Sequence, residues 1–280
     1  MTYISQLMRT MPRIAAATFL CLAPIIGYAA GGPSVALESA NINLDNQAAI
    51  QRGAKYFVNY CMGCHSASYV RYQLLENTGL SAEQIKDNLI FDGSKVSSLM
   101  KSALPKQDAE TWFSGPVPDL TLTARIRGGS DWIYTYLKGF YSDPNRPMGV
   151  NNTLFKNVGM PNVLWELEGI KEPVYRYDVM HNRDLVKQFS DEAEAIQYME
   201  LQGADYRLDK MVDHLVTTKP GLLSVSEFDQ VARDITAYLT YIAEPMKQER
   251  HRMGWWVILF LSLFTTLAYF MKKEWWKDIH

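Results

Sequence analysis

The sequence predicts a mainly α-helical exported domain with long loops, followed by one C-terminal transmembrane helix. Three observations predict it. A Cys-x-x-Cys-His motif occupies residues 61–65, apolar residues recur at helical spacing around it and near the end of the domain, and an uncharged apolar run covers residues 254–271. The chain between its two hydrophobic ends has about 215 residues, which is enough for one compact domain with a sizeable core.

Residues 1–30 have the layout of a secretory signal peptide. Two arginines precede an apolar stretch from Ile14 to Tyr28, no acidic residue occurs in this part, and small residues follow it. We expect cleavage near Ala29 or Ala30, which makes 31–246 the exported domain. An uncleaved N-terminal anchor is the alternative, and it is disfavoured because the apolar run is short and interrupted by a proline.

The sequence CMGCH at residues 61–65 is the signature by which haem is attached covalently to a protein. Each thiol, of Cys61 and of Cys64, would add to a vinyl group of the porphyrin, and His65 would coordinate the iron. A zinc site needs further Cys or His ligands at close spacing, and a redox dithiol needs a βαβ setting; neither is present in the sequence. Because Cys21 lies in the expected signal peptide, no disulfide partner remains. The sequence therefore predicts one covalently bound haem c.

A helix is expected to run into this motif. Asp45 or Asn46 is placed to cap it, and apolar residues recur at helical spacing up to Cys61. Gly53 lowers the helix propensity of this segment, which is tolerable if a second helix crosses closely there. A surface glycine without such a role is the alternative.

Two more helices are predicted further along the chain. Residues 131–140 place apolar side chains on one side, and a longer helix begins at Ser224, where Ser224 and Glu227 form a capping box. Its apolar stripe consists of Phe228, Val231, Ile235, Tyr238, Leu239 and Ile242. Pro245 ends this helix or opens the next one. The remaining segments are rich in Gly, Pro and Asn, and we expect them to be long loops that wrap a flat cofactor.

An iron held by His65 has a second axial position. A methionine sulfur there raises the reduction potential and closes the iron to small molecules, whereas a second histidine lowers the potential. Met160 is the best-placed methionine, because Gly159 allows close backbone approach and Pro161 stiffens the loop. Met148 is the nearest alternative, and the residues alone do not decide between them.

Residues 254–271 read GWWVILFLSLFTTLAYFM, an uncharged run of about the length that crosses a lipid bilayer. Tryptophans flank it on both sides, where their amphipathic rings favour the membrane interfaces. Basic residues also lie on both sides, so the orientation rests on the signal peptide, which places the domain outside. We therefore expect a basic linker and transmembrane helix at 247–271 and a cytoplasmic tail at 272–280. A buried core helix is the alternative, disfavoured by the unbroken apolar run with aromatic and basic flanks.

The expected exported domain is acidic. Of the 28 Lys and Arg and 30 Asp and Glu in the chain, eight basic and three acidic residues lie in the terminal segments, so residues 31–246 carry 20 basic and 27 acidic residues, a formal charge of −7. This balance argues against nucleic acid as a partner and favours a basic protein met by electrostatic steering. An ordinary soluble surface is the alternative, because the sequence does not show where the acidic residues gather.

Several sequence blocks occur in one order between the signal peptide and the C-terminal span. They are RGAKYFVNYCMGCHSASYVRY at 52–72, PDLTLTARIRGG at 118–129, NVGMPNVLWELEG at 157–169 and EFDQVARDITAYLTYIAEP at 227–245. Together they resemble the cytochrome c1 family, the haem subunit of the bacterial ubiquinol–cytochrome c oxidoreductase or cytochrome bc complex. The resemblance implies a cytochrome c-like haem domain.

For the haem site, the resemblance implies Met160 as the sixth iron ligand, in a Gly-Met-Pro loop. It also implies that an arginine after the Pro-Asp-Leu turn pairs with a haem propionate. That residue is Arg127 or Arg125, with Arg127 preferred, and the planar guanidinium can hold a carboxylate with two hydrogen bonds. A solvated surface pair is the alternative for these arginines. No catalytic residue is expected.

Two segments depart from the family pattern. Many relatives have a Pro-Pro-Asp-Leu turn against the haem, whereas this chain has PVPDL at 116–120. Residues 171–218 are longer and more charged than the family leads us to expect, and the sequence offers no functional interpretation of them. We expect His181 and His214 in this stretch to be solvated polar residues, not ligands.

The resemblance implies electron relay. A Rieske iron–sulfur protein, reduced when ubiquinol is oxidised at the cytochrome b subunit, would reduce this haem, and the haem would reduce a cytochrome c. The chain would be a non-catalytic electron-transfer subunit of a dimeric complex, single-pass in the bacterial inner membrane, with its haem domain on the periplasmic side. A membrane-tethered haem subunit of a terminal oxidase is the alternative. A haem peroxidase, which needs an open iron position, and a purely structural anchor are further alternatives.

Overall fold

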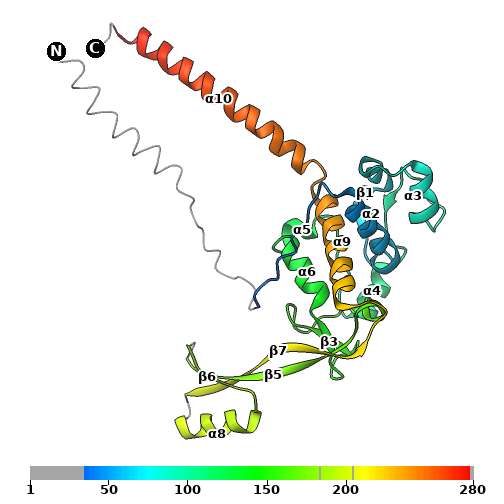
Figure 1. Ribbon diagram of the computed structural model, residues 1–280, viewed down its shortest axis with the longest axis vertical. Coiled ribbons are helices and arrows are strands. Elements are labelled where there is room, and N and C mark those ends of the chain that lie inside the picture. The colour runs from blue at the N-terminus through cyan, green and yellow to red at the C-terminus, as the bar shows by residue number, and fades with distance from the viewer. Residues whose placement is uncertain (1–34, 183, 204, 278–280) are drawn as a thin grey trace, which may run out of the picture. The chain divides into compact units, whose positions relative to one another are not determined.

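The computed structural model describes residues 35–182, 184–203 and 205–277, whose arrangement is drawn in Figure 1. The expected signal peptide at 1–30 lies outside the described residues. Within the described part, one hydrophobic core gathers helices from both ends of the domain, and a smaller second core belongs to a three-stranded sheet.

Helices α2 (Gln47–Tyr56) and α9 (Val225–Ala243) pack against each other in the main core. Asn46 caps α2, as expected from the sequence, because its side-chain oxygen accepts a hydrogen bond from the backbone nitrogen of Ala49 at 3.2 Å. At the crossing, a Cβ added to Gly53 would lie 2.0 Å from the backbone oxygen of Asp234. The close approach of the two helices therefore requires glycine at this position.

An ion pair between the half-exposed Arg52 and the buried Asp234 reinforces the same crossing. The Nε and Nη2 atoms of Arg52 donate to the two carboxylate oxygens of Asp234 at 2.7 and 2.9 Å. Asp234 is only 1 % exposed, and the hydrogen bond it accepts raises the pKa of Arg52. This two-point contact satisfies a carboxylate that the helix packing removes from water.

Helix α9 has the predicted start and the predicted buried face. Ser224 and Glu227 form both hydrogen bonds of the capping box. All six residues of the expected stripe are at most 5 % exposed. The helix ends at Ala243, and Pro245 separates it from helix α10 (Lys247–Trp275).

Helix α6 (Ser130–Lys138) corresponds to the helix expected at 131–140 and packs against α9 and the short helix α5 (Thr123–Ile126). It ends earlier than expected, because the chain turns into strand β3 (Phe140–Ser142), which pairs with β4 (Val150–Asn152).

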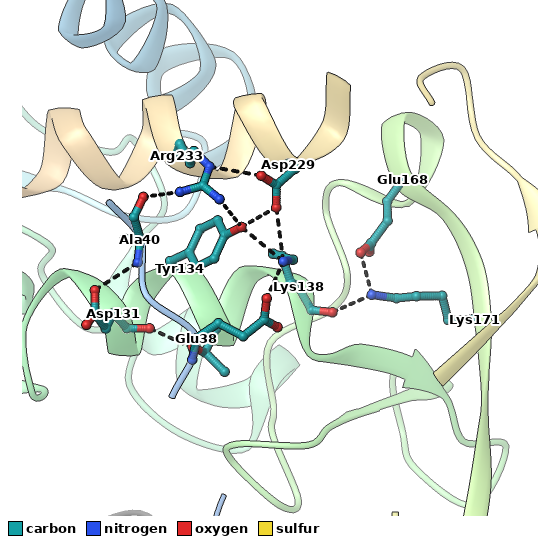
Figure 2. A network of polar contacts seen from close by, with 10 residues as sticks. Glu38, Ala40, Asp131, Tyr134, Lys138, Glu168, Lys171, Asp229 and Arg233 are labelled. Carbon is teal, nitrogen blue, oxygen red and sulfur yellow. Dashed lines mark hydrogen bonds and ion pairs between the residues drawn. The ribbon is translucent and has the colours of Figure 1, made fainter. Parts of the chain in front are cut away.

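Figure 2 shows a network of polar contacts that fastens α6 to α9. The hydroxyl of Tyr134 donates to Asp229, and the Nζ atom of Lys138 lies 3.0 Å from the same carboxylate. Arg233 contacts Asp229 at 2.9 Å and donates to the Tyr134 oxygen at 3.1 Å. The network also binds residues 38–40, so it joins three segments that are far apart in the sequence.

The other elements of the domain are short. They are the π-helical turn η1 (Phe57–Cys61), strand β1 (Ala67–Arg71) paired with β2 (Leu99–Met100), the 3₁₀ helix η2 (Tyr72–Thr78), and helices α3 (Ala82–Leu89), α4 (Lys106–Phe113) and α7 (Trp165–Glu168).

Residues 169–220 correct the expectation of long loops. Strand β5 (Gly169–His181) pairs with β6 (Asp184–Phe189) on one side and β7 (Tyr206–Pro220) on the other, all antiparallel, and helix α8 (Glu192–Gln202) packs on this sheet. Of the described residues, 47 % are in helices and 20 % in strands, so the description as mainly α holds only loosely. Helix periodicity did not reveal these strands, because their stability comes from pairing between β5 and β7.

The base of this sheet holds a buried ion pair. Lys171 donates to the Glu168 carboxylate and to the backbone oxygen of Lys138, as drawn in Figure 2. Burial raises the pKa of Glu168 and lowers that of Lys171, in each case against the attraction of the partner. Gly169 stands beside this pair with φ +97°, and a Cβ there would lie 2.3 Å from the oxygen of Lys219.

Helix α10 contains the apolar run expected at 254–271. Among the described residues it is the one helix long and apolar enough to cross a membrane, and none of its residues is buried.

Candidate functional site

A cavity of about 510 Å³ lies beside the Cys-x-x-Cys-His motif. Its walls come from η1 and the motif residues that follow it, the loop at 113–120, helix α6, the loop at 155–163 and helix α9. The cavity brings together the predicted residues Cys61, Cys64, His65, Met160 and Arg127. Helices from both ends of the domain are therefore needed to close it.

The local backbone turns both thiols to this cavity. Helix α2 widens into the π-helical turn η1, in which the nitrogen of Met62 donates to the oxygen of Phe57 at 2.8 Å. The nitrogen of His65 donates to the oxygen of Cys61, also at 2.8 Å. Such π turns often occur at functional sites, because they change the direction of the following side chains. Neither Cys61 nor Cys64 forms a disulfide within the described residues, and burial raises the pKa of the Cys61 thiol to about 12.

His65 is held in one orientation by a backbone contact. Its Nδ1 atom lies 2.8 Å from the backbone oxygen of Pro118, and the residue is 8 % exposed. Because a carbonyl oxygen only accepts, Nδ1 carries the proton and Nε2 keeps a free lone pair. Burial lowers the pKa of His65 and outweighs the opposing effect of the Pro118 contact. A neutral imidazole with a free Nε2 is the form that binds a metal.

The turn that carries Pro118 is fixed by the next residue. The two carboxylate oxygens of Asp119 accept hydrogen bonds from the backbone nitrogens of Ser68 at 2.8 Å and Thr121 at 2.9 Å. Burial opposes ionisation of Asp119, but the hydrogen bonds from Thr121 and Ser68 outweigh it and lower its pKa. The PVPDL segment of this chain thus forms a firm wall of the cavity, with Val117 among the lining residues.

Met160 lines the cavity, whereas Met148 lies outside the lining residues. The loop runs close to α4, because a Cβ added to Gly159 would lie 2.6 Å from the backbone oxygen of Phe113. Glycine is therefore required at position 159 because the loop contacts the backbone of Phe113. From the sequence we expected the close contact at Gly159 to be with a cofactor.

The side chains of the two candidate arginines have different surroundings. Arg127 lines the cavity, and its guanidinium carbon lies 5.8 Å from the ring centre of Trp132 and 6.0 Å from that of Phe155. Arg125 lies outside the lining residues, with its Nη1 atom 3.7 Å from the carboxylate of Glu244. Only Arg127 is placed to meet a group inside the cavity.

Sequence reasoning missed the aromatic wall on α6. Trp132 and Tyr136 lie one helical turn apart, line the cavity and stack with ring centres 5.0 Å apart. The spacing of four residues was a usable signal, because it places two rings on one helix face. His181 and His214 lie outside the lining residues, and His214 contacts Asp213 at 2.9 Å.

Comparison with known proteins agrees with this geometry. The sequence profile of the Cytochrome C1 family matches residues 39–279. The chain belongs to the cytochrome c1 family. It is 44 % identical to the cytochrome c1 of Allochromatium vinosum, over 96 % of this chain and the whole of that protein. It is 35 % identical to the ammonia monooxygenase gamma subunit of Nitrosomonas europaea, over 93 % of this chain and 96 % of that protein. It is 25 % identical to the cytochrome c1 of Rhodospirillum rubrum, over 84 % and 83 % of the two chains.

Cytochrome c1 proteins carry one covalently bound haem c, and the residues of this cavity fit that group. Cys61 and Cys64, which form no disulfide, lie beside a neutral imidazole whose Nε2 makes no hydrogen bond among the described residues, and most of the remaining wall is apolar. Cytochrome c1 is a haem electron-transfer subunit of the bc1 complex, to which cytochrome b and a Rieske protein also belong. Helix α10 is consistent with its single-pass membrane anchor.

Proposed function

We propose that this chain accepts electrons from a Rieske iron–sulfur protein and passes them to a cytochrome c, as the electron-transfer subunit of a ubiquinol–cytochrome c reductase. The supporting observation is a single cavity in which the two cysteines, His65 and Met160 meet. A histidine and a methionine on one iron leave no coordination position for a substrate, which suits electron transfer and not a peroxidase.

Cys61 and Cys64 would hold the haem through thioether bonds, and His65 and Met160 would coordinate its iron. The bound haem c supplies an iron that changes its oxidation state by one electron. The Pro118 oxygen orients His65 by holding Nδ1, and this also increases the donor strength of Nε2. Apolar side chains from α9, namely Ile235 and Leu239, keep water from this side of the cavity.

Arg127 is the proposed partner of a haem propionate. It is a lining residue with its guanidinium beside Trp132 and Phe155, and a guanidinium matches a carboxylate in charge and shape. Arg125 is the less favoured candidate, because it lies outside the lining residues and its guanidinium faces Glu244.

We further propose that the haem domain lies on the periplasmic side of the bacterial inner membrane and that the complex is dimeric. The expected signal peptide supports export of the domain, and α10 then anchors it through the bilayer beside cytochrome b. The domain boundaries stay those expected from the sequence, with export of residues 31–246.

The native membrane complex tests the electron path. We expect the chain to copurify with cytochrome b and a Rieske protein, and stopped-flow spectroscopy to show quinol reducing haem c and cytochrome c oxidising it. Complex lacking the Rieske subunit is the control, in which quinol should no longer reduce haem c. Undiminished reduction in that control, or copurification with a terminal oxidase instead, would refute the proposal.

A further inference from the structure

The hydroxyl of Tyr136 lies 3.4 Å from the Sδ atom of Met160, inside the cavity. We propose that Tyr136 is a positioning residue that donates a hydrogen bond to the axial sulfur and thereby raises the reduction potential of the haem. The inference rests on the proposed function in one respect, because it requires Met160 to be an iron ligand.

The ring of Tyr136 is held so that its hydroxyl meets the sulfur. Trp132 stacks on it with an interplanar angle of 10°, and Phe140 meets it edge-on with ring centres 5.2 Å apart. The backbone oxygen of Tyr136 accepts a hydrogen bond from the side-chain nitrogen of Asn152 at 2.9 Å. Contacts on both sides of the ring and at its backbone therefore restrict its rotamer.

Helix α6 is itself fixed on its other side. Tyr134, two residues before Tyr136, points away from the cavity into the network of Figure 2, where it contacts Asp229 and Arg233. Lys138 joins the same network from the last turn of the helix. This anchoring prevents α6 from rotating and keeps Tyr136 directed to the sulfur.

A thioether sulfur has two lone pairs, so it can bind iron with one and accept a hydrogen bond with the other. A hydroxyl that donates to the sulfur draws electron density from it and weakens its donation to the iron. The oxidised iron needs that donation more than the reduced iron does, so the hydrogen bond favours reduction. Phenylalanine would fill the same space without this effect, which makes the hydroxyl the functional part of Tyr136.

The experiment compares three variants in the native full complex by redox titration of haem c and by the weak red absorption band that reports a bond between ferric iron and sulfur. Tyr136→Phe should keep the covalent haem and the band and lower the midpoint potential. Tyr238→Phe is the matched control, because it also removes a hydroxyl that donates to a methionine sulfur, that of Met100 at 3.2 Å. Met100 lies outside the cavity-lining residues, so the potential should not change.

Met160→Leu separates the two proposals. If Met160 is the ligand, this variant loses the red band and has a markedly lower potential while the haem stays covalently attached. An unaltered band in Met160→Leu would refute the ligand assignment. A shift in Met160→Leu with no shift in Tyr136→Phe would refute only the role of Tyr136.

Tyr136→Leu tests the same contact if the phenylalanine variant loses its haem, because leucine is apolar and favours a helix. A lower potential with retained haem in either variant supports the inference. Loss of haem from both would overturn it, since a hydroxyl that only tunes the sulfur is not needed to hold the cofactor.

Discussion

Single residues decide the charge around the haem cavity. His65 is kept neutral by burial, and the Pro118 oxygen fixes which nitrogen it presents. In contrast to the neutral His65, Arg127 places a permanent positive charge at the edge of the same cavity. Arg125, two residues before it, lies outside the lining residues, with its Nη1 atom 3.7 Å from the carboxylate of Glu244. Two arginines in one short segment thus have different electrostatic surroundings.

We expect Arg127→Gln to lower the reduction potential of haem c. A nearby positive charge disfavours the oxidised iron, which carries one more positive charge than the reduced iron, so removing the charge favours oxidation. The shift should be modest, because Arg127 is exposed and solvent screens it. Redox titration measures it, and Arg125→Gln is the matched control with little expected change. Equal shifts in the two variants would contradict the special position of Arg127.

At the scale of elements, the crossing of α2 and α9 supports the haem motif. Helix α2 delivers Cys61, and α9 supplies Ile235 and Leu239 to the cavity wall. Gly53 sets the distance between these two helices, because the backbone of α9 lies so close to it that a side chain would not fit. The two helices cannot move apart slightly to admit a side chain without losing other contacts, because protein interiors are close-packed.

Gly53→Ala is expected to destabilise the domain by about 1–3 kcal/mol or more, because the new methyl group overlaps backbone atoms that cannot move independently. Chemical denaturation followed by the haem absorption would measure the loss. Gly254→Ala is the control, since Gly254 is also in a helix and a Cβ there would lie more than 4 Å from every other described residue outside its own helix turn. Unchanged stability of Gly53→Ala would show that the helices can move apart at no cost.

For the molecule as a whole, the charge of the domain proposed to be exported is the property that a soluble partner meets first. Residues 31–246 carry a formal charge of −7, whereas basic residues gather beside the membrane anchor. A negative domain attracts a basic partner over a distance of about 10 Å at moderate salt, which increases the rate of encounter. We therefore expect the proposed acceptor, a cytochrome c, to have a basic surface, which this attraction would steer toward the domain.

Electron transfer from reduced complex to a basic cytochrome c should therefore slow as salt is added. We expect the second-order rate constant to fall by about tenfold or more between low and high ionic strength, measured by stopped-flow spectroscopy. An uncharged small oxidant serves as the control, because its encounter rate does not depend on salt. A rate with cytochrome c that stays constant would exclude steering by the acidic domain.

The sequence alone predicted the haem motif, helices α2, α6 and α9, and the apolar run of α10. These features depend on neighbours within a few residues: thiol spacing, capping, and apolar periodicity. The start of α9 was predictable from its capping box, whereas the sequence left open whether Pro245 ends this helix or opens the next one.

The tertiary structure decided what distant segments do together. The sequence favoured Met160 over Met148 without deciding between them, and the path of the chain places Met160 in the cavity and leaves Met148 outside it. The strands of residues 169–220 escaped prediction because their hydrogen bonds pair β5 with β7, across a long stretch of chain. The contact of Tyr136 with Met160 likewise joins a helix to a loop. Local physics determines elements and covalent chemistry, whereas cavities, pairings and contacts between elements arise only when the whole domain packs.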